Sequence, residues 1–178
     1  MMGKAEDMLK IAGTFALFTG IIGLLFNWIK TCRQKGKKIK AFENLLTESI
    51  YRLKRENIRL CDFFDSVGTG DMEVDAGCKE IAKMLRQHQV SFVTEAWGKV
   101  WDTKLGEWKL SKKERGIIEN MGALFMGGKL AEIEDKARSQ RGELEFVRKK
   151  SMEEYEQKSK VFIPVVILCT LLLTIILI

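Results

Sequence analysis

Few residues in this 178-residue chain have types and spacings that could support chemistry. The single His, His88, excludes a metal site that needs two imidazoles, and its place at the edge of an apolar stripe predicts a helix-surface or core-edge residue. The four cysteines show no C-x-x-C spacing, which predicts neither a zinc ribbon nor a disulfide framework; they are Cys32, Cys61, Cys78 and Cys169.

Three alternating carboxylates, Asp71, Glu73 and Asp75, are similar to the start of a calcium-binding loop. Such a loop needs Gly at its sixth position and Glu at its twelfth, and this chain has Ala76 and Ala82 there. We therefore predict a solvated acidic loop and no metal site.

A glycine-rich segment superficially resembles a phosphate-binding loop, with Gly122, Gly127, Gly128 and Lys129. The template requires Lys directly after the second Gly and then Ser or Thr, whereas Gly128 intervenes and Leu130 follows. We expect no catalytic residue, no cofactor and no small-molecule substrate, and hence a protein that is not an enzyme.

Two uncharged segments bracket the rest of the chain, residues 11–29 and residues 161–178. At about 1.5 Å per helical residue they reach roughly 27–29 Å, close to the thickness of one hydrocarbon core. The first is long and lacks a small-residue cleavage site, so it predicts an uncleaved anchor. We expect a transmembrane helix in each segment, preceded by a short outer N-terminus at 1–10.

The basic residues indicate the orientation of these spans. Residues 30–40 hold six cations and no acid, so this juxtamembrane segment accounts for the net charge of +6. The positive-inside rule then places residues 30–160 in the cytoplasm. We expect residues 30–40 to contact the membrane lipid. Residues 41–160 hold 22 basic and 22 acidic residues, which argues against nucleic-acid binding.

Residues 41–160 predict an all-α cytoplasmic bundle. One apolar stripe over 41–66 predicts a helix, and a glycine-rich loop follows at 67–77. The helical spacing resumes over 78–101, with a helix break favoured near 89–94. Ser111 and Glu114 form a capping box that opens the next helix, which we expect to end at Gly127-Gly128. A long helix then approaches the second span. Pro164 predicts a hinge there, which is either a kink at Lys160–Pro164 or the start of a new helix with Pro in its first turn.

Two groups of residues are candidates for packing or partner contact. Trp97 and Trp101 lie one helical turn apart, which is typical of core packing and also of a partner-facing patch. Ala12, Ala16 and Gly20 recur every four residues, as in ordinary lipid-facing positions or in closely packed transmembrane helices.

Several segments are similar to one known family. They are LLTESIYR at 45–52, SFVTEAWGKVW at 91–101, LSKKERGIIENMGALFMGG at 110–128 and the final 30 residues. Glu95-Ala96-Trp97 and Gly122-x4-Gly127 are the most specific of these motifs. In their order between two spans they resemble the stage III sporulation protein AB family, although Gly128-Lys129-Leu130 and Pro164 depart from its pattern.

The resemblance implies a platform component of a secretion-like complex between mother cell and forespore. It implies a secretion-type ATPase and other stage III sporulation membrane proteins as partners, and the outer forespore membrane as the location. It also makes Gly122 and Gly127 candidates for the partner interface. Two other hypotheses account for the same residues: a sporulation-independent membrane-anchored helical adaptor, and a membrane-bound enzyme acting through scattered carboxylates.

Overall fold

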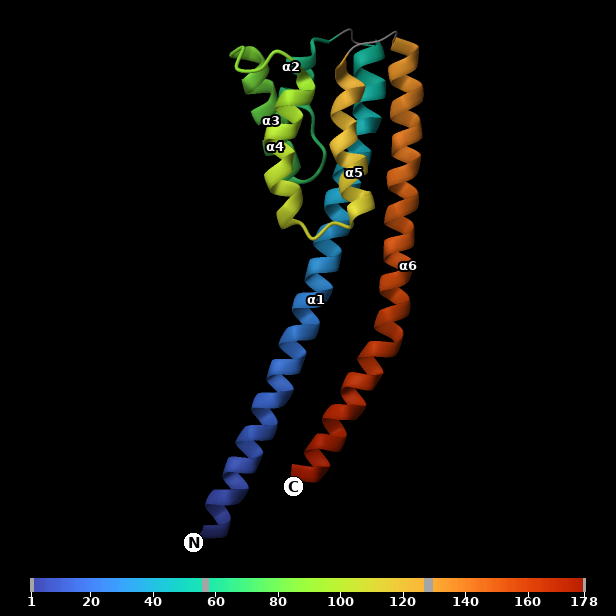
Figure 1. Ribbon diagram of the computed structural model, residues 1–178. Helices are drawn as coiled ribbons and strands as arrows, with labels where there is room; N and C mark the ends of the chain where they lie inside the picture. The colour runs from blue at the N-terminus through green and yellow to red at the C-terminus, as the bar shows by residue number, and fades with distance from the viewer. Residues whose placement is uncertain (1, 56–57, 127–129, 178) are drawn as a thin grey trace. The chain divides into compact units, whose positions relative to one another are not determined.

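The computed structural model describes residues 2–55, 58–126 and 130–177, with side chains for most of 19–53, 58–126 and 134–172. Its ordered elements are helices, and no β-strand occurs in these ranges, which confirms the all-α prediction (Figure 1). The chain divides into two compact units: unit 1 is Met1–Gln34 with Ser151–Ile178, and unit 2 is Lys35–Lys150. Two long helices, α1 (Met2–Arg55) and α6 (Leu130–Leu177), each contribute to both units.

Unit 2 adds four α-helices and one 3-10 helix between these long helices. They are α2 (Leu60–Ser66), α3 (Met72–Arg86), α4 (Val93–Glu107), α5 (Lys112–Met121) and η1 (Gly122–Met126). Figure 1 shows α3 and α4 beside each other, and α3 also contacts α2. Short connections of this kind favour antiparallel helix pairs.

Local residue chemistry sets most of the helix ends. The capping box is confirmed, since Ser111 accepts from the Glu114 N–H while Glu114 accepts from the Ser111 N–H. The break near 89–94 is also confirmed: α3 ends at Arg86, and His88 takes a φ of 51° before α4 begins at Val93.

Two predicted boundaries were wrong. The stripe at 41–66 does not form one helix, because α1 ends at Arg55 and the extended backbone of Arg59 precedes α2. The loop predicted at 67–77 is shorter, because Asp71 caps α3 and the helix begins at Met72. The helix from Ser111 tightens into 3-10 geometry at Gly122, and the expected cap at Gly127-Gly128 lies outside the described residues.

The core of unit 2 is built around aromatic rings. Trp97 and Trp101 of α4 lie 5.6 Å apart, and the Phe42 ring on α1 packs edge-on 5.0 Å from Trp101. Two glycines leave room for the indoles. A Cβ on Gly77 would lie 2.4 Å from the Trp101 ring, and one on Gly122 would lie 2.7 Å from Trp97.

Unit 1 consists of the N-terminal part of α1, up to Gln34, and the C-terminal part of α6, from Ser151. Many of its large apolar side chains are exposed, including Leu24 and Phe26 on α1 and Phe162 and Leu168 on α6. Helix α6 continues through Pro164 without a break. Within the described residues, none of the helices contains an apolar stretch of the length and hydropathy needed to cross a membrane.

Candidate functional site

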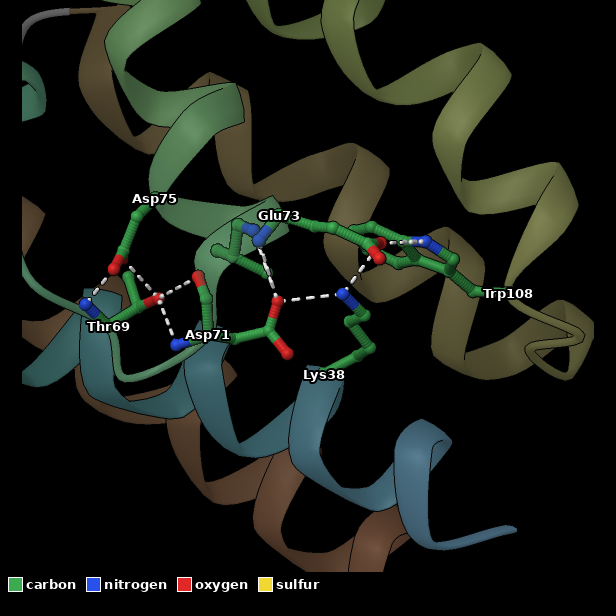
Figure 2. Close-up of polar contacts among 7 residues, drawn as sticks. Lys38, Thr69, Asp71, Glu73, Asp75 and Trp108 are labelled. Atoms are coloured by element: carbon green, nitrogen blue, oxygen red, sulfur yellow. Dashed lines mark hydrogen bonds and ion pairs between the residues drawn. The ribbon is translucent and has the colours of Figure 1, made fainter. Parts of the chain in front are cut away.

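The densest polar arrangement among the described residues surrounds Lys38, near the start of unit 2 (Figure 2). The Lys38 Nζ lies 2.7 Å from Asp71 Oδ1 and 2.7 Å from Glu73 Oε2. It also lies 4.7 Å from the centre of the Trp108 ring, whose Nε1 donates to Glu73 Oε2 at 3.0 Å. We call Lys38, Asp71, Glu73 and Trp108 the Lys38 cluster; it joins α1, the start of α3 and the end of α4.

A second set of hydrogen bonds fixes the loop before α3. Thr69 is buried, and both its N–H and its hydroxyl donate to Asp75 Oδ1, at 2.7 and 2.6 Å. From α1, the Asn44 side chain donates to the Thr69 carbonyl at 2.8 Å. Gly70 takes a φ of +87°, a conformation that a residue with a side chain rarely adopts, so the loop needs glycine there.

The environment of Asp71 favours its ionised form. Burial by itself raises the pKa of Asp71, but the hydrogen bond and charge of Lys38 and the N–H groups of Val74 and Glu73 together outweigh it. The pKa of Asp71 therefore lies below its ordinary value of 3.8. At neutral pH the carboxylate is ionised, and it both caps α3 and pairs with Lys38.

These contacts correct the interpretation of the three alternating carboxylates as a solvated acidic loop. Asp71 and Glu73 accept from Lys38, and Asp75 accepts from Thr69. The Lys38 ammonium thus lies between the carboxylates of Asp71 and Glu73. In the described ranges, no group of three or more His, Cys, Asp or Glu side chains is placed to hold a metal ion.

Two further carboxylates bind cations inside unit 2. The Lys35 ammonium lies 2.8 Å from Glu114 Oε2, and the Glu114 side chain is only 1% exposed. Glu43, also buried, accepts from Arg148 Nε of α6 at 2.7 Å. One short stretch of α1, residues 35–43, therefore makes ion pairs with α3, α5 and α6. Such buried pairs specify which helices meet, because removing one partner leaves an uncompensated charge.

The Cys78 thiol of α3 is buried in the core. Burial, and then the nearby charge of Asp75, raise the pKa of Cys78 to about 12, while Lys104 acts in the opposite direction. The thiol is therefore protonated at neutral pH and is a poor nucleophile. This cysteine serves as packing in unit 2 and provides a chemical reporter of its unfolding.

The predicted tryptophan pair lies in the core. Trp97 is 2% exposed and Trp101 is fully buried, so neither ring offers surface to a partner. The Trp97 Nε1 donates to the Ile118 carbonyl at 2.9 Å, whereas the Trp101 Nε1 has no hydrogen-bond partner among the described atoms. Gly122 is buried against Trp97, and Gly127 lies outside the described residues.

The residues predicted for helix packing and bending are on unit 1. Ala16 and Gly20 are exposed, no atom lies within 4 Å of a Cβ built on Gly20, and the side chain of Ala12 lies outside the described residues. Pro164 is exposed within α6. His88 is exposed in the turn between α3 and α4.

Sequence reasoning missed the Lys38 cluster and the Lys35–Glu114 pair, because it assigned the whole run 30–40 to a juxtamembrane role. One signal was available. Lys35 and Lys38 share a helical face with Ile39 and Phe42, at spacings of three, four and seven residues. Cations on the apolar face of a helix indicate buried ion pairs.

A comparison with known protein families shows to which family the chain belongs. The family model of stage III sporulation protein AB matches residues 10–178, nearly the whole chain. The chain belongs to this family. Searches of the curated proteins and of the solved structures found no match. Membership extends over both units, so the aromatic core, the Lys38 cluster and the apolar ends of α1 and α6 all lie in the region that defines the family.

Proposed function

We propose that this chain is a non-enzymatic, membrane-anchored platform subunit of a stage III sporulation complex. In this proposal unit 2 lies in the cytoplasm of the mother cell and binds a secretion-type ATPase, which it couples to the membrane subunits of a channel. The family match over residues 10–178 carries the sporulation part of the proposal.

The exposed apolar side chains of unit 1 support anchoring. Large side chains such as Leu24, Phe26 and Leu168 are more than half exposed, which would be costly in water over so many positions. They fall within the uncharged segments 11–29 and 161–178. Cations stand at the inner end of each segment, as the positive-inside rule requires for a cytoplasmic unit 2.

The use of charged groups supports a structural rather than a catalytic role. The buried carboxylates of Glu43 and Glu114 accept from cations of the protein itself, as does half-buried Asp71. The buried thiol of Cys78 is held protonated. Groups paired in this way stabilise helix contacts and are not available as general bases.

Two exposed apolar side chains of unit 2 lie near the start of α4, and we call them the Phe92–Met126 patch. Phe92 precedes the first turn of α4, and Met126 ends η1; both are exposed by more than half. The Thr94 hydroxyl donates to the Met126 sulfur at 3.0 Å, which brings η1 to this end of α4. Exposed aromatic and methionine side chains are enriched at protein interfaces. We assign this patch to the ATPase contact.

The test is affinity purification of the tagged full chain from membranes of its host during sporulation and during growth. We expect a secretion-type ATPase to co-purify from sporulating cells. The double substitution Phe92→Ser and Met126→Ser should reduce ATPase recovery at least about tenfold, because truncating a hot-spot residue of an interface costs about 2 kcal/mol or more. Tyr51→Ser is the matched control, since Tyr51 is similarly exposed on another helix.

Three outcomes decide the proposal. ATPase recovery lost with the double variant and kept with Tyr51→Ser supports it. Equal recovery of the ATPase with all variants would show that the ATPase binds another surface of the chain. A chain that extracts as a soluble protein, without membranes, contradicts the anchoring.

A further inference from the structure

Unit 1 contains an apolar groove between α1 and α6. Its volume is about 750 Å³, within the range that small-molecule sites occupy. The walls are formed by side chains such as Ile21, Leu24 and Trp28 of α1 and Phe162 and Val165 of α6. Lys158 is the single charged residue among the nine that line it.

The groove has two chemically different ends. In unit 1 the two helices run in opposite directions, as Figure 1 shows, so the Trp28 end of α1 faces the Lys158 end of α6. The Trp28 ring lies 4.8 Å from Tyr155 and 6.0 Å from Phe162. About 10 Å further along α1, at Ile21, the lining is hydrocarbon alone.

We propose that this groove binds an acyl chain of an anionic phospholipid, with the Lys158 ammonium on the lipid phosphate. The inference rests on the membrane anchoring under the proposed function. Tryptophan and tyrosine favour the level of lipid headgroups, where the ammonium of a lysine meets the phosphate. Lys158 lies at the same end as Trp28 and Tyr155, and the hydrocarbon end lies deeper.

The surrounding charge complements an anionic headgroup. Lys30 and Arg33 follow Trp28 on α1 and are exposed, and α1 has no acidic residue between Asp7 and Glu43. On α6, Glu154 and Glu156 are exposed, and in the described part of the chain no carboxylate forms an ion pair with Lys158.

The same lysine argues against a protein occupant. An apolar helix of another protein lying in the groove would cover the Lys158 ammonium without supplying a counter-charge, which is costly. A second copy anchored in the same orientation would bring cations of both chains to the same end of the groove, and among the described residues no carboxylate lines the groove to pair with them. A lipid phosphate satisfies the ammonium, and the acyl chain fills the remainder of the groove.

The test uses Trp28 as a reporter of lipid contact. The full chain is reconstituted into vesicles of unbrominated phosphatidylcholine. One series adds increasing fractions of phosphatidylglycerol with brominated acyl chains, and a second series adds brominated phosphatidylcholine instead. Bromine quenches indole fluorescence on contact, and subtraction of the Trp28→Phe variant isolates the Trp28 signal. Flotation of the same vesicles measures membrane association separately.

We expect half-maximal quenching of Trp28 at about a fivefold lower fraction of the brominated phosphatidylglycerol, the preference that one lysine near an anionic lipid typically provides. Lys158→Gln should remove most of this preference, and any remainder is the contribution of Lys30 and Arg33. Lys160→Gln removes the same charge from an exposed residue that does not line the groove, and it should keep the preference.

Equal quenching by the two lipids, or a preference that Lys158→Gln leaves unchanged, would overturn the lipid assignment. So would an unquenched Trp28 in a chain that floats with the vesicles, because a protein segment would then occupy the groove. A chain that does not float at all would instead overturn the membrane anchoring, and the groove proposal with it.

Discussion

The two units of the chain use their large apolar side chains in opposite ways. In unit 2, Trp97, Trp101 and Phe42 are at most 2% exposed and pack against one another. In unit 1, Leu24 and Phe26 are each 72% exposed. The helices of unit 2 thus bury these aromatic rings within the chain, whereas those of unit 1 leave large apolar side chains exposed. Composition alone does not show which apolar side chains are buried and which are exposed, whereas the structure does.

Charged residues show the same contrast. Unit 2 places cations such as Lys35 and Lys38 against its own carboxylates. Unit 1 leaves Lys30 and Arg33 exposed. Lys35 and Lys38 of this basic run thus join helices of unit 2, whereas Lys30 and Arg33 remain exposed.

The largest effect on the stability of unit 2 should come from removing an indole ring from its core. Trp97→Ala should lower the free energy of unfolding of unit 2 by about 3–5 kcal/mol, because it leaves a cavity in the core and removes the hydrogen bond to the Ile118 carbonyl. Trp28→Ala in unit 1 should leave that value unchanged. The measurement is labelling of the buried Cys78 thiol against urea, in full-length chain whose other three cysteines are Ser. Equal effects of the two substitutions would contradict the division between the units.

The glycines beside the indoles should come next. Gly77→Ala or Gly122→Ala should destabilise unit 2 by about 1–3 kcal/mol, because the new methyl group meets an indole ring that its neighbours hold in place. Gly116→Ala is the control: it lies in α5 with no atom within 4 Å of the added Cβ, and helix propensity predicts a small gain. The Cys78 labelling assay distinguishes loss from gain.

The Lys38 cluster should have an intermediate effect. Lys38→Met should cost about 1–3 kcal/mol, because two carboxylates lose their cation in a partly buried place. Lys37→Met, at an exposed neighbour, should change stability by less than about 0.5 kcal/mol. If urea titrations gave the same free energy of unfolding for both variants, Lys38 would contribute no more to the fold than an exposed lysine.

The smallest effect should appear in the pH dependence. The folded pKa of Asp71 is below 3.8, so the Asp71 carboxylate stabilises the fold above that pH, and this contribution is lost as the pH falls through the folded value. Asp71→Asn keeps a capping oxygen and removes the charge. The stability difference between wild type and Asp71→Asn, from urea titrations followed by circular dichroism, should shrink from pH 6 to pH 2. A constant difference would contradict this role.

How far sequence predicted the molecule depends on the range of each interaction. The Ser111–Glu114 capping box was predictable, because both partners lie within four residues. The end of α1 at Arg55 was not, because the apolar spacing continues across it. The Lys38–Asp71 pair joins residues 33 apart, and only packing of α1 on α3 brings them together.

The site residues divide in the same way. The Trp97 and Trp101 spacing allowed either core or interface, and burial places both in the core. Gly122 was noticed as part of a family motif, but its contact with Trp97 depends on how η1 folds over α4. Phe92 and Met126, exposed at the same end of α4, had no sequence signal to mark them.

Helix α1 passes from unit 1 to unit 2, between Gln34 and Lys35, without interruption. None of the side chains at 31–37 is buried, whereas Ile39, Phe42 and Leu46 are. Backbone hydrogen bonds without core packing open at a lower free-energy cost. Amide hydrogens at 31–37 should therefore exchange with deuterium well before those at 39–46, so that one continuous helix contains two segments that open independently.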